Sequence, residues 1–117
     1  MNTLSTILLC CVAFEHFYFL VLEMFLWTTP KGMKAFGLSK EQAERSKVLA
    51  ANQGLYNGFL AAGLIWGIAS GKTDVIVFFL ICVSVAGIYG SYSTKMIKLF
   101  YVQAVPALLA LGVWLLS

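Results

Sequence analysis

Three ionisable residues lie inside the first long apolar stretch of the chain: Glu15, His16 and Glu23. A charged side chain near the centre of a membrane-spanning helix costs ~2.5–3.5 kcal/mol on insertion scales, so such residues usually face a protein interior or water. Seven positions separate His16 from Glu23, which places them within ~20° of each other on one helix face. Because a carboxyl group can hold a proton or a cation, this face is a candidate site for proton or ligand binding.

Polar residues of the other apolar stretches fall at a depth similar to that of Glu23. Asn52 lies five positions after Lys47, and Gln103 lies five positions after Lys98, so both are near the same predicted membrane boundary. We therefore predict a cytoplasm-facing polar pocket whose floor is formed by Glu15 and His16. Its expected ligand- or proton-binding residues are Glu15, His16, Glu23, Asn52, Gln53, Asn57 and Gln103, and its expected lining residues are Trp27, Tyr56, Tyr89 and Tyr92.

A purely structural interpretation of the amides stays open, because Asn and Gln often join membrane helices by hydrogen bonds worth ~0.6–2 kcal/mol. Adjacent residues diverge by ~100° on a helix, so Glu15 and His16 are poorly placed to chelate one ion. Cys10, Cys11 and Cys82 fall within apolar stretches, where cysteine behaves as a small apolar residue. The sequence therefore predicts neither a metal site nor a cofactor.

The composition requires a membrane environment for the elements that position these residues. Of 117 residues, 61% are hydrophobic and only 11% are charged, whereas a soluble domain has about a quarter of its residues charged. Each of four apolar stretches is near the ~20 residues that cross a bilayer as a helix. We predict an all-α fold, an integral membrane four-helix bundle in a single domain (1–117), with spans at about 3–28, 48–70, 74–92 and 99–116.

The distribution of positive charge predicts the topology. Seven of the eight Lys and Arg residues lie between the first and second spans or between the third and fourth, and Lys72 alone lies on the opposite side. By the positive-inside rule both termini are expected on the non-cytoplasmic side of the cell membrane. We read the net charge of +3 as this bias rather than as a nucleic-acid surface. Anionic lipid head groups are expected to attract Lys31, Lys34 and Lys40.

Local signals refine the helices. Ser39 and Gln42 have the spacing of a capping box, so the second helix is expected to begin near residue 40. Pro106 is expected to kink the last helix one turn after Gln103. Small residues four apart predict close helix contacts and self-association, with a dimer favoured. These are Gly54 with Gly58 and Ala62, Gly63 with Gly67, and Gly87 with Ser91.

The chain resembles the domain-of-unknown-function 1304 (DUF1304) family of small membrane proteins. The resemblance depends on Glu15-His16, Leu22-Glu23-Met24 and Trp27, and on Tyr89-Gly90, Thr94, Gln103 and Pro106-Ala107. Its most specific part is the string Asn52-Gln53-Gly54-Leu55-Tyr56-Asn57. The resemblance implies a four-helix integral membrane fold and supplies no activity.

The residues leave three functions open. The first is transport or binding of a small solute, with proton coupling at an acid near the midplane. The second is a membrane-embedded enzyme acting on a lipid or sterol-like substrate, in which the carboxyls and His16 would shuttle a proton. The third is a structural or partner protein without a ligand. Whether the chain is an enzyme is left undecided by the sequence.

Overall fold

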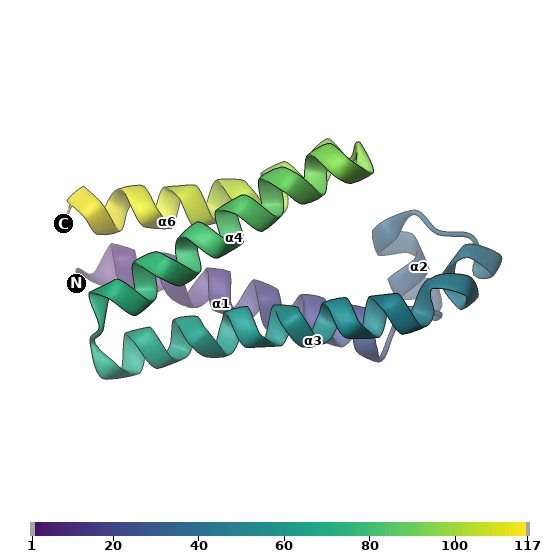
Figure 1. Ribbon diagram of the computed structural model, residues 1–117, viewed down its shortest axis with the longest axis horizontal. Helices are drawn as coiled ribbons and strands as arrows, with labels where there is room; N and C mark the ends of the chain where they lie inside the picture. The colour runs from purple at the N-terminus through teal and green to yellow at the C-terminus, as the bar shows by residue number, and fades with distance from the viewer. Residues whose placement is uncertain (1, 117) are drawn as a thin grey trace. The chain divides into compact units, whose positions relative to one another are not determined.

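A computed structural model describes residues 2–116, and over this range the chain is all-α, as predicted (Figure 1). Short helical elements separate or extend the long ones. The elements are α1 (Thr3–Met24), α2 (Pro30–Phe36), α3 (Lys40–Ser70), α4 (Thr73–Thr94), α5 (Ile97–Leu99), the π-helix η1 (Phe100–Ala104) and α6 (Val105–Leu116).

Three helical stretches of the described residues are long and apolar enough to cross a membrane: Thr3–Met24, Thr73–Thr94 and Ile97–Leu116. They indicate a membrane protein. Helix α3 is longer, with 31 residues, but it begins with several charged residues. Its apolar part is also interrupted by Asn52, Gln53 and Asn57, which lower its hydropathy. The structure thus supports three of the four predicted spans by length and composition.

The first helix ends earlier than the sequence predicted. Helix α1 stops at Met24 rather than at Thr28, and the chain turns before α2 begins at Pro30. Thr29 caps α2, since its side chain accepts a hydrogen bond from the backbone N–H of Gly32. Pro30 occupies the first turn of α2, where its missing N–H is not needed. Pro30 therefore starts a short helix after α1 has ended.

The predicted boundaries of α3 are confirmed. The backbone N–H of Ser39 donates to Gln42 Oε1 at 2.9 Å, and the backbone N–H of Gln42 donates to Ser39 Oγ at 3.1 Å. This reciprocal pair is the expected capping box. At the other end Gly71 adopts a φ of +64°, a left-handed conformation that favours glycine, and the chain reverses into α4.

The chain divides into two compact units. The terminal unit comprises the residues up to Phe14 and those from Leu60 onward. The central unit comprises Glu15–Phe59. Helices α1 and α3 each contribute residues to both units. Each unit is described separately below.

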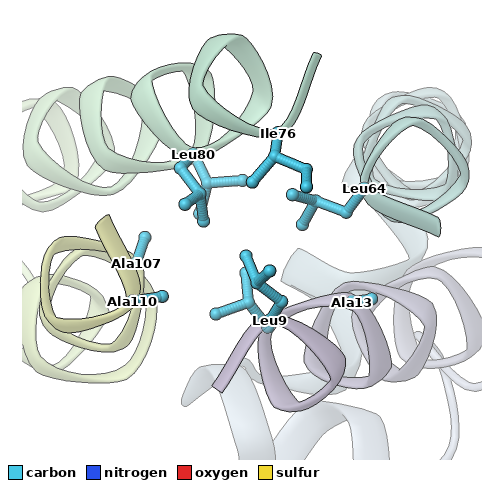
Figure 2. Packing of buried hydrophobic residues seen from close by; sticks show 9 residues of the cluster. Leu9, Ala13, Leu64, Ile76, Leu80, Ala107 and Ala110 are labelled. Atoms are coloured by element: carbon cyan, nitrogen blue, oxygen red, sulfur yellow. The ribbon is translucent and has the colours of Figure 1, made fainter. Parts of the chain in front are cut away.

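The core of the terminal unit is built from four helices. Leu9 and Ala13 of α1, Leu64 of α3, Ile76 and Leu80 of α4, and Ala107 and Ala110 of α6 point toward one another (Figure 2). All are less than 5% exposed. The helices approach closely at glycines, as expected. A Cβ on Gly63 would overlap the Phe79 ring, and one on Gly67 would lie 2.7 Å from the Ile76 side chain.

The last membrane stretch is irregular just before Pro106. Residues Phe100–Ala104 form the π-helix η1, and the backbone N–H of Val105 bonds to the carbonyl of Phe100. The sequence predicted a kink at Pro106, and the structure shows a wider, π-helical turn directly before that residue. A Cβ on Gly87 of α4 would lie 2.7 Å from the backbone nitrogen of Ala104, so α4 packs directly against the backbone of η1.

Candidate functional site

The central unit contains a buried carboxyl–amide pair. Asn57 Nδ2 of α3 donates a hydrogen bond to Glu23 Oε1 of α1. Glu23 is 7% exposed and Asn57 is 4% exposed, so the pair is removed from solvent. Because buried polar groups are costly without partners, this bond fixes α3 against the end of α1 at this level.

Glycines allow this contact. A Cβ on Gly54 would lie 3.0 Å from Glu23 Cβ and 3.2 Å from the carbonyl oxygen of Leu20. One turn further along α3, a Cβ on Gly58 would lie 2.6 Å from the Leu20 side chain. The predicted Gly54–Gly58 pair therefore brings the α3 backbone close to α1 and places Asn57 within reach of Glu23.

A pocket of about 360 Å³ lies beside this pair, between the end of α1, the turn that follows it and the first half of α3. Its lining combines one carboxyl, one amide, one hydroxyl, one indole and one amine with apolar side chains. The residues that line it are Glu23, Met24, Phe25, Trp27, Thr28, Lys47, Val48, Ala51 and Asn52. Of the predicted site residues, the structure thus gathers Glu23, Asn52 and Trp27 around one pocket, with Asn57 bonded to Glu23.

Trp27 is held in place on two sides. Its Nε1–H donates to Ser46 Oγ of α3 at 3.0 Å, and its ring lies 4.7 Å from the ring of Phe36 of α2. Ser46 in turn donates to the backbone carbonyl of Gln42 at 2.7 Å. The indole is therefore a fixed wall of the pocket and connects the turn, α2 and α3.

Lys47 is a lining residue that the sequence analysis missed, because it was counted only as a topological charge. Its Nζ lies 3.3 Å from Glu44 Oε2, one turn earlier on α3. The positions that α3 contributes to the pocket are 47 with 51 and 48 with 52, two pairs spaced four apart. That spacing puts Lys47 on the same side of the helix as Ala51 and could have indicated its place.

Glu15 and His16 do not line this pocket. They precede Glu23 by eight and seven residues, which is ~11–12 Å along the helix axis. His16 is fully buried, its Nδ1 lies 3.9 Å from Glu15 Oε1, and its ring meets Phe19 edge-on at 5.3 Å. Glu15 Oε1 is buried and has no hydrogen-bond partner among residues 2–116. The two residues form a separate polar position deeper along α1.

The remaining predicted residues lie elsewhere. Gln53 and Tyr56 are exposed on α3 and do not line the pocket. Tyr89, Tyr92 and Gln103 belong to the terminal unit, where the two tyrosines are exposed and Gln103 is half-buried within η1. Within the described part of the chain, no group of three or more His, Cys, Asp or Glu side chains could hold a metal ion.

The arrangement can exchange protons and accept hydrogen bonds. A carboxylate accepts a hydrogen bond from the Asn57 amide, and a protonated carboxyl can donate to the same amide's oxygen. A solute in the pocket would meet Glu23 and Asn52 as polar partners and the Trp27 indole as an aromatic one. An indole face attracts cations, which extends the range of solutes the pocket suits.

Comparison with known proteins gives a family and no activity. Residues 10–115 match the family described as "Protein of unknown function (DUF1304)". The chain is also 36% identical over 115 residues to an uncharacterized protein, YpaA, from Lactococcus lactis subsp. lactis (strain IL1403), a match that covers 95% of this chain and 96% of YpaA. No solved structure matches the chain. The predicted resemblance is confirmed, and the chain belongs to the DUF1304 family of proteins of unknown function.

Proposed function

We propose that this protein binds a small solute in the pocket beside Glu23 and carries it across the cell membrane, with Glu23 exchanging a proton. The observation that carries the proposal is the buried Glu23–Asn57 pair at the edge of an open pocket. An ionisable side chain in a membrane segment is a candidate functional group, because burying it costs free energy and helices can pack together without it.

The size and chemistry of the pocket support binding of a small molecule. Its volume of about 360 Å³ lies at the lower end of the range for ligand pockets, ~300–1,000 Å³. Five of the nine lining residues are apolar or aromatic, and Glu23, Thr28, Lys47 and Asn52 supply polar groups that can orient a ligand. The proposed solute is therefore small, partly apolar, and able to donate a hydrogen bond to a carboxylate.

The proposal includes a fourth span formed by α3. Its 31 residues extend ~46 Å, enough to cross the hydrocarbon core and project beyond it. The hydrogen bond from Asn57 to Glu23 gives the Asn57 amide a partner, which lowers the free-energy cost of placing α3 in a membrane. With four spans, both termini lie outside, the pocket is near the cytoplasmic face, and the protein is multi-pass.

Proton flux into proteoliposomes tests this function. The full chain is reconstituted with a trapped pH-sensitive dye, a pH gradient is imposed, and valinomycin with potassium clamps the membrane potential. We expect flux above that of protein-free liposomes, and we expect Glu23→Gln to reduce it to that background. Gln retains an oxygen that can accept from Asn57, so the helix contact is preserved while the titratable group is lost.

Glu41→Gln is the matched control, since Glu41 lies in the same unit, is exposed and pairs with Arg45 outside the pocket. It is expected to conduct protons like the wild type. Equal flux in Glu23→Gln and wild type, or no wild-type flux, would overturn the proposal that Glu23 carries protons across the membrane. In that case the Glu23–Asn57 bond joins α1 to α3 without moving protons across the membrane, and the enzyme and structural interpretations are the ones left.

A further inference from the structure

Helix α2 has one buried face and one charged face. Gly32 is buried against the turn after α1, where an added Cβ would overlap the carbonyl oxygen of Leu26. Phe36, four residues later, packs against Trp27. Lys31 and Lys34 are exposed. They are three residues apart, so their side chains are neighbours on the helix surface.

The positive charge of this region is only partly compensated. Residues 31–47 contain five cationic side chains and two carboxylates. Both carboxylates are occupied: Arg45 pairs with Glu41 at 2.6 Å and Lys47 pairs with Glu44 at 3.3 Å. Lys31, Lys34 and Lys40 have no carboxylate within 4.0 Å in the described part of the chain.

The position of Lys31 shows where this charge lies relative to a membrane helix. Its Nζ is 5.5 Å from the centroid of the Tyr18 ring, on the exposed surface of α1. Tyr18 is 40% exposed and belongs to a stretch long and apolar enough to span a bilayer. Tyrosine is enriched at the level of the lipid head groups, and lysine stems extend along apolar surface to reach that level.

We propose that Lys31 and Lys34, together with the Tyr18 ring, bind the head group of an anionic phospholipid. Two neighbouring amines contact the lipid phosphate, and the acyl chains lie along the exposed apolar surface of α1, which includes Phe17 and Val21. Lys40 adds to the local positive potential. The inference is independent of solute transport, because none of these residues lines the Glu23 pocket.

Native mass spectrometry of the full chain in a neutral detergent tests the site. Equal amounts of phosphatidylglycerol and phosphatidylcholine with identical acyl chains are added, and the lipid retained on the protein is counted. The wild type is expected to retain phosphatidylglycerol in preference. The K31Q/K34Q variant is expected to lose this preference, because its relative affinity for phosphatidylglycerol falls about fivefold for each lysine that is replaced.

Lys72→Gln provides a matched control, since Lys72 also places its Nζ over an aromatic ring, at 5.3 Å from the Trp66 centroid. It is expected to retain lipid like the wild type. K31R/K34R keeps both charges and is expected to retain the preference, which separates loss of charge from loss of fold. Unchanged preference in K31Q/K34Q, or none in the wild type, would overturn the proposal. Displacement of phosphatidylglycerol by an equal concentration of inorganic phosphate would also overturn it, because the site would then bind free phosphate.

Discussion

At the scale of single residues, the partner of Glu23 matters as much as the acid. A lysine or arginine opposite Glu23 would hold the carboxylate permanently ionised, whereas the Asn57 amide can donate to the ionised form and accept from the neutral one. The pair is therefore compatible with both protonation states without rearrangement of the helices. Such tolerance is what a group that exchanges protons requires.

Removal of this amide should destabilise the protein. Asn57→Ala leaves the buried Glu23 carboxyl without its amide donor, and we expect a loss of about 0.6 kcal/mol, the average measured for hydrogen bonds between membrane helices, and at most about 1.7 kcal/mol. Gln53→Ala changes an exposed amide on the same helix and is expected to have no effect. Thermal unfolding of the purified variants checks this, and equal midpoints for the two would contradict it.

The sequence predicted the individual groups of the site better than their grouping. Glu23, Asn57, Asn52 and Trp27 were identified because polar residues in apolar stretches are conspicuous. The sequence placed Glu15 and His16 deeper than Glu23 but as the floor of the same pocket. In the structure they do not line it, since one helix face can contain two separate polar positions ~11 Å apart along its axis. Lys47 was missed because a cation at a predicted membrane boundary has an ordinary topological explanation.

At the scale of the elements, close approach at small residues determines which helices meet. Gly54 and Gly58 adjoin α1, Gly63 and Gly67 adjoin α4, and Gly87 adjoins η1. The sequence predicted these close contacts, but small-residue spacing alone does not distinguish a neighbouring helix from a second copy of the chain. For these five glycines, the partner is a helix of the same chain.

Two glycines offer a direct comparison of this effect. Gly87→Ala places a Cβ 2.7 Å from the Ala104 nitrogen, a backbone atom that cannot move aside, and we expect a loss of about 1–3 kcal/mol from overpacking. A Cβ on Gly112 would meet open space, with no neighbouring atom within 4 Å, so Gly112→Ala is expected to be neutral or stabilising by up to about 1 kcal/mol. Unfolding in denaturant measures both, and a stability of Gly87→Ala at or above wild type would refute the contact.

At the scale of the whole molecule, composition predicted the class because a chain with 11% charged residues cannot cover a water-facing surface. The capping residues predicted the start of α3, since this signal is local. Helix α2 was not foreseen, because seven residues containing two lysines give too short a periodic pattern. The early end of α1 depends on Trp27 reaching Ser46 and Phe36, which are distant in sequence.

The proposed topology predicts opposite accessibility for two surface positions. In a background without Cys10, Cys11 and Cys82, Lys40→Cys is expected to resist a membrane-impermeant maleimide in intact cells and to react after lysis. Lys72→Cys, in the single short turn between α3 and α4, is expected to react in intact cells. Labelling of both positions, or of neither, before lysis would contradict a spanning α3 with both termini outside.

The π-helix η1 has a consequence for how this chain tolerates changes in length. A bond from Val105 to Phe100 encloses one residue more than an α-helical bond, so η1 is equivalent to a single-residue insertion absorbed within a helix. Deleting one residue between 100 and 104 would restore a regular helix without rotating Ala107 and Ala110 relative to α4. The same deletion after Ala104 would turn the following side chains by ~100° and remove those alanines from the core. Among relatives, gaps of one residue should therefore collect at η1 and be absent from α6.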